Sequence, residues 1–261
     1  MEVVIVEDPA EGGSLAGSAI SILFNRNPFA VLGLATGSSP EPVYDDLAGR
    51  YARSETSFRR GRAFLLDEYV GLPAGHPESY RAVIERQVLA RLDFDTSSVK
   101  SPDGTAADLT AACSNYESAI ADAGGVAIQL LGIGTDGHIG FNEPGSSLAS
   151  RTRIKTLTAQ TRQDNSRFFG GDPHSVPQHV LTQGIGTIMD ARHLILLAWG
   201  ADKAEALTQA IEGPITSSLP ASALQLHPHV TAIADRDATS RLTRRDYYIE
   251  TWNAKPDWQT I

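Results

Sequence analysis

The chain has 261 residues, of which 41% are hydrophobic and 20% are charged, so it is long enough to bury a sizeable core and too apolar for disorder. Its net charge of -9 argues against a nucleic-acid partner, which normally needs a basic patch. Cys113 is the only cysteine, which excludes an intrachain disulfide. No apolar run approaches the roughly 18 residues of a membrane span, and the acidic start lacks a signal-peptide pattern. We therefore expect a cytoplasmic protein with no membrane partner.

Short apolar runs alternate with helical patterns along the chain. The runs predict strands at residues 3–6, 30–35, 63–66, 126–134, 193–199 and 229–234. They are apolar almost throughout, which is typical of strands covered on both faces. Helical patterns occupy residues 40–52, 79–92, 108–123 and 202–213. This alternation predicts an α/β fold, with a single domain over residues 1–261, a doubly wound, mainly parallel, Rossmann-like sheet, and helices on both faces.

Residues 157–178 form the longest stretch without clear periodicity. A structureless connection of this length is uncommon in a compact domain unless it is functional. We expect a lid or a binding loop here and call these residues the lid segment. Ligands of doubly wound folds bind beyond the carboxyl ends of the strands, so we expect the catalytic and binding residues to follow the ends of the strands.

A Thr-Gly-Ser-Ser turn follows the strand that ends at Ala35. Pro40 suits the first turn of a helix, with Ser39 as its expected N-cap. Backbone N–H groups and hydroxyls of Gly37, Ser38 and Ser39 would meet at the positive end of that helix, which suits a phosphate. The turn lacks the Gly-Lys-Ser/Thr ending of a nucleotide-binding loop, and an ordinary capped turn explains it equally well.

Two further strand ends carry carboxylates. Asp67 and Glu68 directly follow residues 63–66, where a partly desolvated carboxylate can act as a general base, although a solvated pair is the commoner outcome. Asp136, His138 and Glu143 lie on a glycine-rich loop, and a carboxylate beside a histidine suits proton transfer. A divalent metal site and a structural turn capped by Asp136 are the alternatives. We favour proton transfer because three titratable groups share one loop.

A fourth strand end places Lys203 in the first turn of a helix. A cation there opposes the helix dipole unless an anion lies nearby, although a solvated lysine explains the position equally well. Together, the four strand ends predict a site for proton transfer on a small phosphorylated molecule.

Several long stretches of the chain match one known family. They are LATGSSPEPVY, LLDEYVGLP, LGIGTDGHIGFNEPGSSLASRTRIKTLT, NSRFF and ALQLHPHVTAIAD. In these stretches, and from about residue 1 to residue 250, the chain resembles the glucosamine-6-phosphate deaminases. The resemblance implies conversion of glucosamine 6-phosphate and water to fructose 6-phosphate and ammonia, in amino-sugar catabolism. It also implies that neither a metal nor an organic cofactor takes part.

The resemblance assigns roles to the residues already singled out. It implies that Asp67 is the base that moves a proton between C2 and C1 of the opened sugar. His138 would assist ring opening as acid and base, with Asp136 and Glu143 orienting it. The residues implied to bind the substrate phosphate are Gly37, Ser38, Ser39, Lys203 and, from the lid segment, Arg167.

Regulation is a further implication of the resemblance. Some relatives are hexamers that N-acetylglucosamine 6-phosphate activates by binding to a second phosphate pocket between subunits. The resemblance implies that Ser146, Arg153 and Lys155 occupy the positions of that pocket. Two solvated cations on one face of a strand are the alternative. Allosteric relatives also use a C-terminal tyrosine, whereas this chain has Ile249 at that position and Tyr248 one residue earlier. We expect a homo-oligomer, most often a hexamer in such relatives, and leave its cooperativity open.

Two other functions fit the same pattern in part. One is a 6-phosphogluconolactonase-like hydrolase, although relatives of that kind carry an arginine where this chain has Tyr69 and lack the DGHIGFNEP stretch. The other is a non-catalytic domain that senses sugar phosphates, which would need a DNA-binding segment, whereas the first strand is predicted from residue 3. Ammonia release from glucosamine 6-phosphate separates the three.

Overall fold

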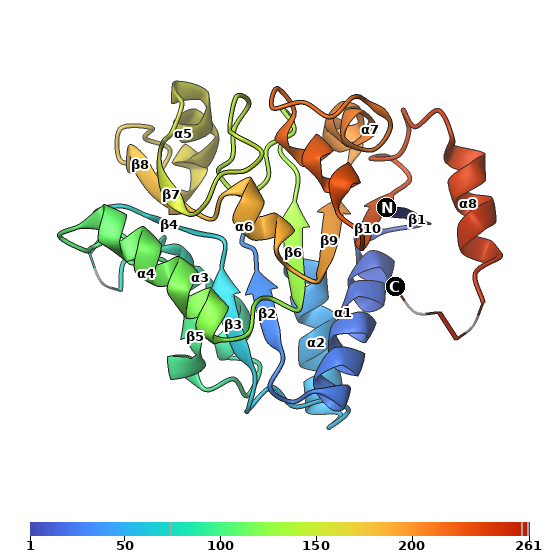
Figure 1. Cartoon of the computed structure of the whole chain (residues 1–261), viewed down its shortest axis with the longest axis horizontal. Coiled ribbons are helices and arrows are strands. Elements are labelled where there is room, and N and C mark those ends of the chain that lie inside the picture. The colour runs from blue at the N-terminus through green and yellow to red at the C-terminus, as the bar shows by residue number, and fades with distance from the viewer. Residues whose placement is uncertain (74, 257, 260) are drawn as a thin grey trace.

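The computed structural model describes residues 1–73, 75–256, 258–259 and 261 (Figure 1). Its central sheet has seven strands, all paired in parallel, in the order β1-β10-β9-β6-β2-β3-β5. The strands are β1 (Glu2–Val6), β2 (Val31–Leu34), β3 (Arg62–Leu65), β5 (Val99–Lys100), β6 (Ile128–Gly132), β9 (His193–Ala198) and β10 (Val230–Asp235). Every predicted strand lies in this sheet. The additional strand, β5, has two residues and is too short to produce an apolar run.

The direction of the chain across the sheet reverses between β2 and β6. From β2 the chain continues to β3 and β5, whereas from β6 it continues to β9 and β10 on the other side. Ligands of such sheets bind beyond the carboxyl ends of the strands at this reversal. Because β9, β6, β2 and β3 are consecutive in the sheet, the four strand ends with predicted chemistry lie next to one another.

Helices cover both faces of the sheet, as predicted. Their bounds are α1 (Pro9–Arg26), α2 (Glu41–Ala52), α3 (Tyr80–Ile84), α4 (Leu109–Asp122), α5 (Ala159–Asn165), α6 (Ile185–Met189), α7 (Ala204–Glu212) and α8 (Arg245–Asn253). Helices α1 and α2 connect strands in one direction across the sheet, and α4, α6 and α7 connect strands in the opposite direction. Because such connections are right-handed, the two groups of helices lie on opposite faces of the sheet. Within the described ranges, none of the helices combines the length and apolarity that crossing a membrane requires.

Helices α1, α5, α6 and α8 were not predicted. In α1 the apolar pattern is interrupted by glycines, which pack against α2 at close range (Figure 1). A Cβ on Gly13 would lie 2.5 Å from the backbone of Pro42, and one on Gly17 would lie 2.1 Å from Asp46 Oδ2. The same glycines that weaken the helical pattern therefore allow the two helices to approach. The predicted helix at 79–92 is divided into α3 and a turn of π-helix, Glu85–Leu89.

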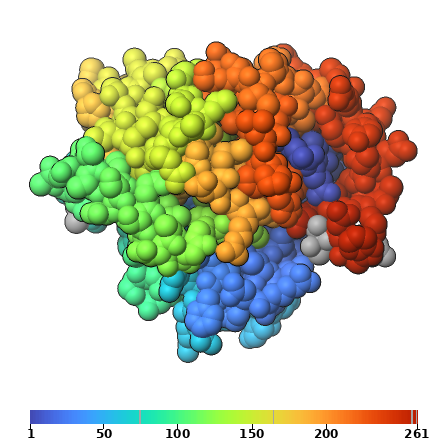
Figure 2. All heavy atoms as spheres, in the orientation of Figure 1, coloured from blue at the N-terminus to red at the C-terminus, as the bar shows by residue number. Residues whose placement is uncertain are grey.

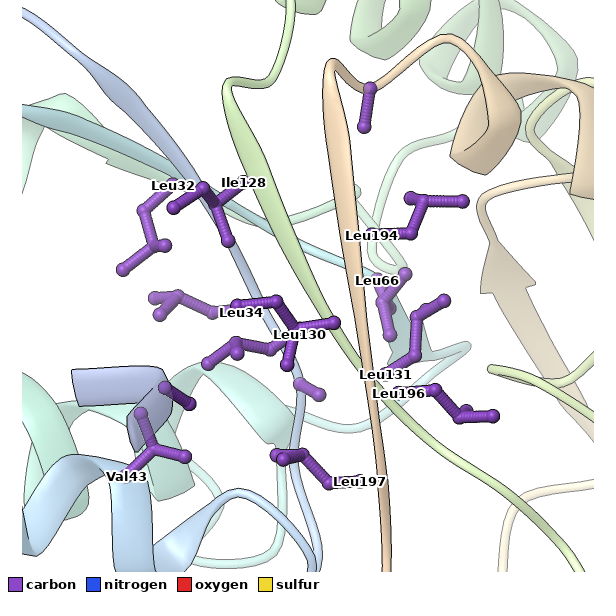
Figure 3. Packing of buried hydrophobic residues seen from close by; sticks show 14 of the residues in the cluster. Leu32, Leu34, Val43, Leu66, Ile128, Leu130, Leu131, Leu194, Leu196 and Leu197 are labelled. Atoms are coloured by element: carbon purple, nitrogen blue, oxygen red, sulfur yellow. The ribbon is translucent and has the colours of Figure 1, made fainter. Parts of the chain in front are cut away.

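The core lies on both sides of the sheet (Figure 3). Every residue of β2, β9 and β10 is buried, which explains why these runs are apolar almost throughout. Leu34 and Leu130 have no exposed surface, and each such side chain contributes about 1.5–3 kcal/mol by its removal from water. A rigid core of this kind fixes the strand ends that carry the polar residues.

A second sheet lies above the carboxyl ends of the first. It has three antiparallel strands in the order β4-β8-β7, with bounds β4 (Asp67–Tyr69), β8 (His179–Thr182) and β7 (Arg153–Thr156). The lid segment joins β7 to β8 and contains α5 and a 3-10 turn, Ser166–Phe168, so it is partly helical. Figure 2 shows it at the upper left of this face, beside the yellow-green loop that follows β6.

Candidate active site

Asp67 and Glu68 have different roles: the carboxyl group of Glu68 accepts hydrogen bonds, and that of Asp67 is free of hydrogen bonds to the described residues. Asp67 is 5% exposed, and its side chain has no hydrogen-bond partner among the described residues. Burial, with a smaller contribution from the charge of Glu68, raises the pKa of Asp67 to about 8. Glu68 instead accepts N–H bonds from Tyr69, Tyr80 and Arg81 at 2.9, 3.0 and 2.8 Å, which caps the first turn of α3. Asp67 is therefore the residue of this pair available for proton transfer.

His138 is held by Asp136 on the loop that follows β6, residues 133–143, which we call the histidine loop. Asp136 Oδ1 lies 2.6 Å from His138 Nδ1 and also accepts the backbone N–H of His138 at 3.1 Å. The contact with His138 lowers the pKa of Asp136, so this carboxylate is ionised at neutral pH. A carboxylate on Nδ1 favours the tautomer with hydrogen on Nδ1 and leaves Nε2 free to accept a proton.

Two glycines allow the histidine loop to turn back on itself. A Cβ on Gly134 would lie 2.2 Å from ring atoms of His138, so only glycine lets the imidazole fold over this position. Gly137 has φ +83, a conformation that costs other residues energy. The glycines of this stretch are thus explained by the placement of His138.

Glu143 points towards the lid segment. Its side chain is buried and accepts the hydroxyl of Thr161, which belongs to α5. The structure therefore gives Asp136 the contact with His138, while Glu143 connects the histidine loop to the lid segment. In the described part of the chain, no group of three or more His, Cys, Asp or Glu side chains is arranged to hold a metal ion.

The loop after β2 leaves its backbone donors free. Gly37 has φ +90 and is exposed, as is Ser38. Within the described residues, the N–H groups of Gly37, Ser38 and Ser39 donate no hydrogen bond. The prediction that Ser39 caps the helix was wrong, because the N-cap residue of α2 is Pro40 and no side chain caps it.

The loop after β2 is bonded to the end of β9. Ser39 O accepts the indole N–H of Trp199 at 2.8 Å, and Ser39 Oγ would lie 3.1 Å from a Cβ on Gly132 at the end of β6. Three neighbouring strand ends therefore meet at Ser39. Ser39 joins the loop after β2 to the end of β9 through its backbone oxygen and does not cap the helix.

The two predicted phosphate-binding cations lie on different elements. Lys203 ends the 3-10 turn Ala201–Lys203 that leads into α7, and its Nζ lies 3.3 Å from Asp202 Oδ2. Arg167 is exposed on the lid segment, with its guanidinium 4.7 Å from the centre of the Phe168 ring. Among the described residues, no hydrogen bond or ion pair joins Arg167 to Lys203 or to residues 37–39.

The predicted activator residues lie on β7 and on the loop that precedes it. Ser146 is buried, and its hydroxyl has no partner within the described residues. Arg153 and Lys155 alternate along β7 and are half-buried on the same face. Burial lowers the pKa of Arg153. Tyr248 donates to Glu212 at 3.2 Å from α8, at the opposite end of the molecule from β7 (Figure 1).

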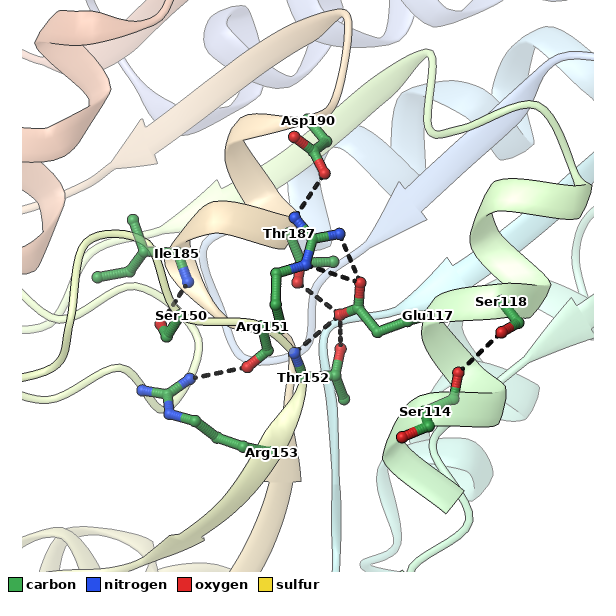
Figure 4. A network of polar contacts seen from close by, with 10 residues as sticks. All are labelled: Ser114, Glu117, Ser118, Ser150, Arg151, Thr152, Arg153, Ile185, Thr187 and Asp190. Carbon is green, nitrogen blue, oxygen red and sulfur yellow. Dashed lines mark hydrogen bonds and ion pairs between the residues drawn. The ribbon is translucent and has the colours of Figure 1, made fainter. Parts of the chain in front are cut away.

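A polar network holds the start of β7 against α4 and α6 (Figure 4). Glu117 of α4 accepts hydrogen bonds from Arg151, Thr152 and Thr187. Burial raises the pKa of Glu117, but these hydrogen bonds outweigh burial and leave it below the usual value. The network therefore fixes the strand that carries Arg153.

The sequence pattern did not reveal the contacts that Tyr69 makes. Its hydroxyl accepts Asn165 Nδ2 at 3.0 Å, and its ring packs edge-on against Phe169 at 5.5 Å. Tyr69 thereby joins the strand of Asp67 to the lid segment. No periodicity signals such a contact, because the two residues lie 96 positions apart in sequence.

Known proteins are similar to this chain over most of its length. The profile of a family described as glucosamine-6-phosphate isomerases/6-phosphogluconolactonase matches residues 14–233. The glucosamine-6-phosphate deaminases of Mycolicibacterium smegmatis and Streptomyces coelicolor are 62% and 58% identical to it over 261 residues, which is all of each chain. A solved structure described as a monomeric glucosamine-6-phosphate deaminase is 42% identical, with a TM-score of 0.89, and the match covers 92% of this chain and 99% of that one.

A 6-phosphogluconolactonase from Trypanosoma cruzi shares the fold. Its TM-score is 0.74 at 24% identity, and the match covers 93% of this chain and 97% of that one. The family profile matches most of the chain, and relatives are highly identical to it over its full length. The chain belongs to the glucosamine-6-phosphate isomerase and 6-phosphogluconolactonase family.

Proposed function

We propose that this protein catalyses the isomerising deamination of glucosamine 6-phosphate, with water, to fructose 6-phosphate and ammonia. The observation that carries the proposal is that two proton-transfer groups follow the carboxyl ends of β3 and β6, the two strands that flank β2 in the sheet. One is Asp67, buried and with a pKa of about 8, and the other is His138, held by Asp136. Full-length relatives named glucosamine-6-phosphate deaminase support the same reaction.

Each group has a step suited to its chemistry. Asp67 removes the proton from C2 of the opened sugar and returns it to C1, and a base with a pKa near the working pH is suited to both transfers. His138 moves a proton during ring opening through Nε2, while Asp136 holds its tautomer. These carboxyl and imidazole groups cover the proton transfers at C2, at C1 and in ring opening, and we propose that neither a metal nor an organic cofactor takes part.

The phosphate does not react, but it fixes the substrate. The free N–H groups of residues 37–39, together with Lys203 and Arg167, are the groups we assign to it. Its binding energy holds the flexible open chain against Asp67. Truncation of Lys203 or Arg167 should therefore raise KM about 10- to 100-fold, since each contact is worth roughly 1.5–3 kcal/mol. Truncation of Arg26, an exposed cation at the end of α1, should leave KM unchanged.

The decisive experiment measures products from three candidate substrates. We expect ammonia and fructose 6-phosphate from glucosamine 6-phosphate, and almost none from unphosphorylated glucosamine. Hydrolysis of 6-phosphogluconolactone without ammonia release would favour the lactonase alternative. Binding of sugar phosphate with no turnover of either compound would favour the sensing domain.

We also propose that Ser146, Arg153 and Lys155 bind the phosphate of N-acetylglucosamine 6-phosphate in a homo-oligomer, with a hexamer favoured. Support comes from the unpartnered hydroxyl of Ser146 and the two cations on one face of β7. Because Tyr248 lies at the other end of the chain, any contribution from it would have to come from another subunit. The solved relative described as monomeric is the reason to measure assembly first.

The test titrates substrate with and without N-acetylglucosamine 6-phosphate, for the parent protein and for Lys155→Ala. Linked sites require the activator to shift substrate affinity in the parent and not in the variant. Light scattering reports the assembly. A monomer with identical hyperbolic curves in both conditions would reject the regulatory proposal and leave the catalytic one intact. We propose a cytoplasmic location, consistent with the single buried and unpaired cysteine, Cys113.

A further inference from the structure

Asp67 is positioned by its backbone. Its carboxyl group has no hydrogen-bond partner among the described residues, so no side chain fixes where it stands. Its strand, β4, has three residues, each paired with a residue of β8. The residue opposite Asp67 is Thr182. Residues opposite each other in an antiparallel pair project from the same face of the sheet, so Thr182 and Asp67 point the same way.

The hydroxyl of Thr182 reaches the histidine loop. Thr182 has no exposed surface, and its Oγ1 accepts the backbone N–H of Phe141 at 3.2 Å. One residue earlier, a Cβ on Gly140 would lie 3.2 Å from Thr182 Oγ1 and 3.6 Å from Asp67 Oδ2. The histidine loop therefore touches the strand pair β4–β8 where Asp67 and Thr182 lie side by side.

A second bond fastens the loop to the same place. Asn142 is fully buried, and its Nδ2 donates to Ile139 O at 3.0 Å and to Gln183 O at 2.8 Å. One of these bonds closes the loop on itself, and the other joins it to the residue after Thr182. Residues 139–142 directly follow His138 in sequence, so these two attachments hold the part of the loop next to His138 against the end of β8.

We propose that Thr182 is a positioning residue for this reaction, and that its hydroxyl sets the placement of the histidine loop relative to Asp67. The inference rests on the proposed deaminase function. It assigns no chemistry to Thr182, which is buried beneath the loop. A misplacement of catalytic groups by about 1 Å lowers turnover strongly, whereas binding of the phosphate, assigned to residues elsewhere, is spared.

The test compares substitutions that keep or remove the hydroxyl. Thr182→Val keeps the shape and loses the acceptor, and we expect kcat to fall at least about tenfold, or roughly 1.4 kcal/mol in the barrier, with KM within threefold of the parent. Thr182→Ser keeps the hydroxyl and should restore kcat to within about threefold. Thr231→Val is the matched control, because Thr231 is equally buried on β10 and bonded to His193 Nε2 at 3.0 Å. It should lower stability without changing kcat.

Several results would overturn the proposal. They are a Thr182→Val enzyme with kcat within threefold of the parent, a loss that Thr182→Ser does not restore, and a loss seen in KM with kcat unchanged. If Thr182→Val does not fold, Thr182→Cys replaces it, because sulfur is a weak acceptor and should give the same loss of kcat. Ammonia release by the parent protein is measured first, so a failure of the proposed function is recognised separately from a failure of the Thr182 proposal.

Discussion

At the scale of single residues, Asp67 has the most direct consequence for activity. Asp67→Asn should fold and lose deamination, because an amide cannot accept the C2 proton. Exchange of solvent deuterium into C2 should disappear with it. Glu68→Gln is not a suitable control, because Glu68 caps α3 and its substitution would disturb that helix. The control is Asp45→Asn, at an exposed position of α2. If Asp67→Asn retained activity within tenfold of the parent, Asp67 would not be the base.

The raised pKa of Asp67 also predicts an effect on stability. Its pKa is about 8 in the folded protein and near 3.8 when unfolded, so between these values the folded state holds a proton that the unfolded state has released. The free energy of unfolding therefore decreases as pH rises through this range. Asp67→Asn should remove this cost and raise Tm, most strongly above pH 8 and not at all below about pH 4. An equal or lower Tm at pH 8 would show that burial does not raise this pKa.

At the scale of elements, the lid segment depends on Tyr69. Tyr69→Phe removes the acceptor of the Asn165 bond while keeping the ring that packs on Phe169. We expect faster proteolysis within residues 157–178. We also expect KM to rise about fivefold, because Arg167 lies two residues after Asn165 and the lost hydrogen bond is worth roughly 1 kcal/mol. Tyr51→Phe, on α2, should change neither property. Equal protease sensitivity of Tyr69→Phe and the parent would reject the coupling.

At the scale of the whole molecule, a histidine cluster predicts how stability depends on acid. His193 of β9 stacks on His229 with ring centres 3.6 Å apart, and Lys255 pairs with Glu2 of β1 nearby. Burial lowers the pKa of His193 to about 3, with smaller contributions from the charges of His229, His227 and Lys255. Burial also lowers the pKa of His229, and the charge of Glu2 acts against that decrease.

The direction of the effect follows from these pKa values. Unfolded His193 takes up a proton near pH 6.5, and the folded protein does so only near pH 3, so stability decreases as pH falls through this interval. Urea unfolding at pH 7.5 and pH 5 should show a smaller loss for His193→Gln than for the parent. His174→Gln, an exposed histidine of the lid segment, should show the parent's loss. Equal losses for all three proteins would contradict the assignment to His193.

Much of this protein followed from its sequence. The continuous apolar runs predicted the strands of the parallel sheet, because strands covered on both faces require them. Polar residues placed directly after those runs marked the ends of β2, β3, β6 and β9 as the region of chemistry. The pair of Asp136 and His138 is also local in sequence, so its hydrogen bond could be anticipated.

Other features were decided by tertiary structure alone. The division of roles between Asp67 and Glu68 depends on α3, whose first N–H groups lie over Glu68. The small sheet that places Thr182 opposite Asp67 joins strands of three or four residues, too short for a periodic pattern, from parts of the chain that are far apart. Sequence patterns report periodicity and local turns, whereas burial of a carboxyl group and pairing across the sheet arise only when distant segments pack together.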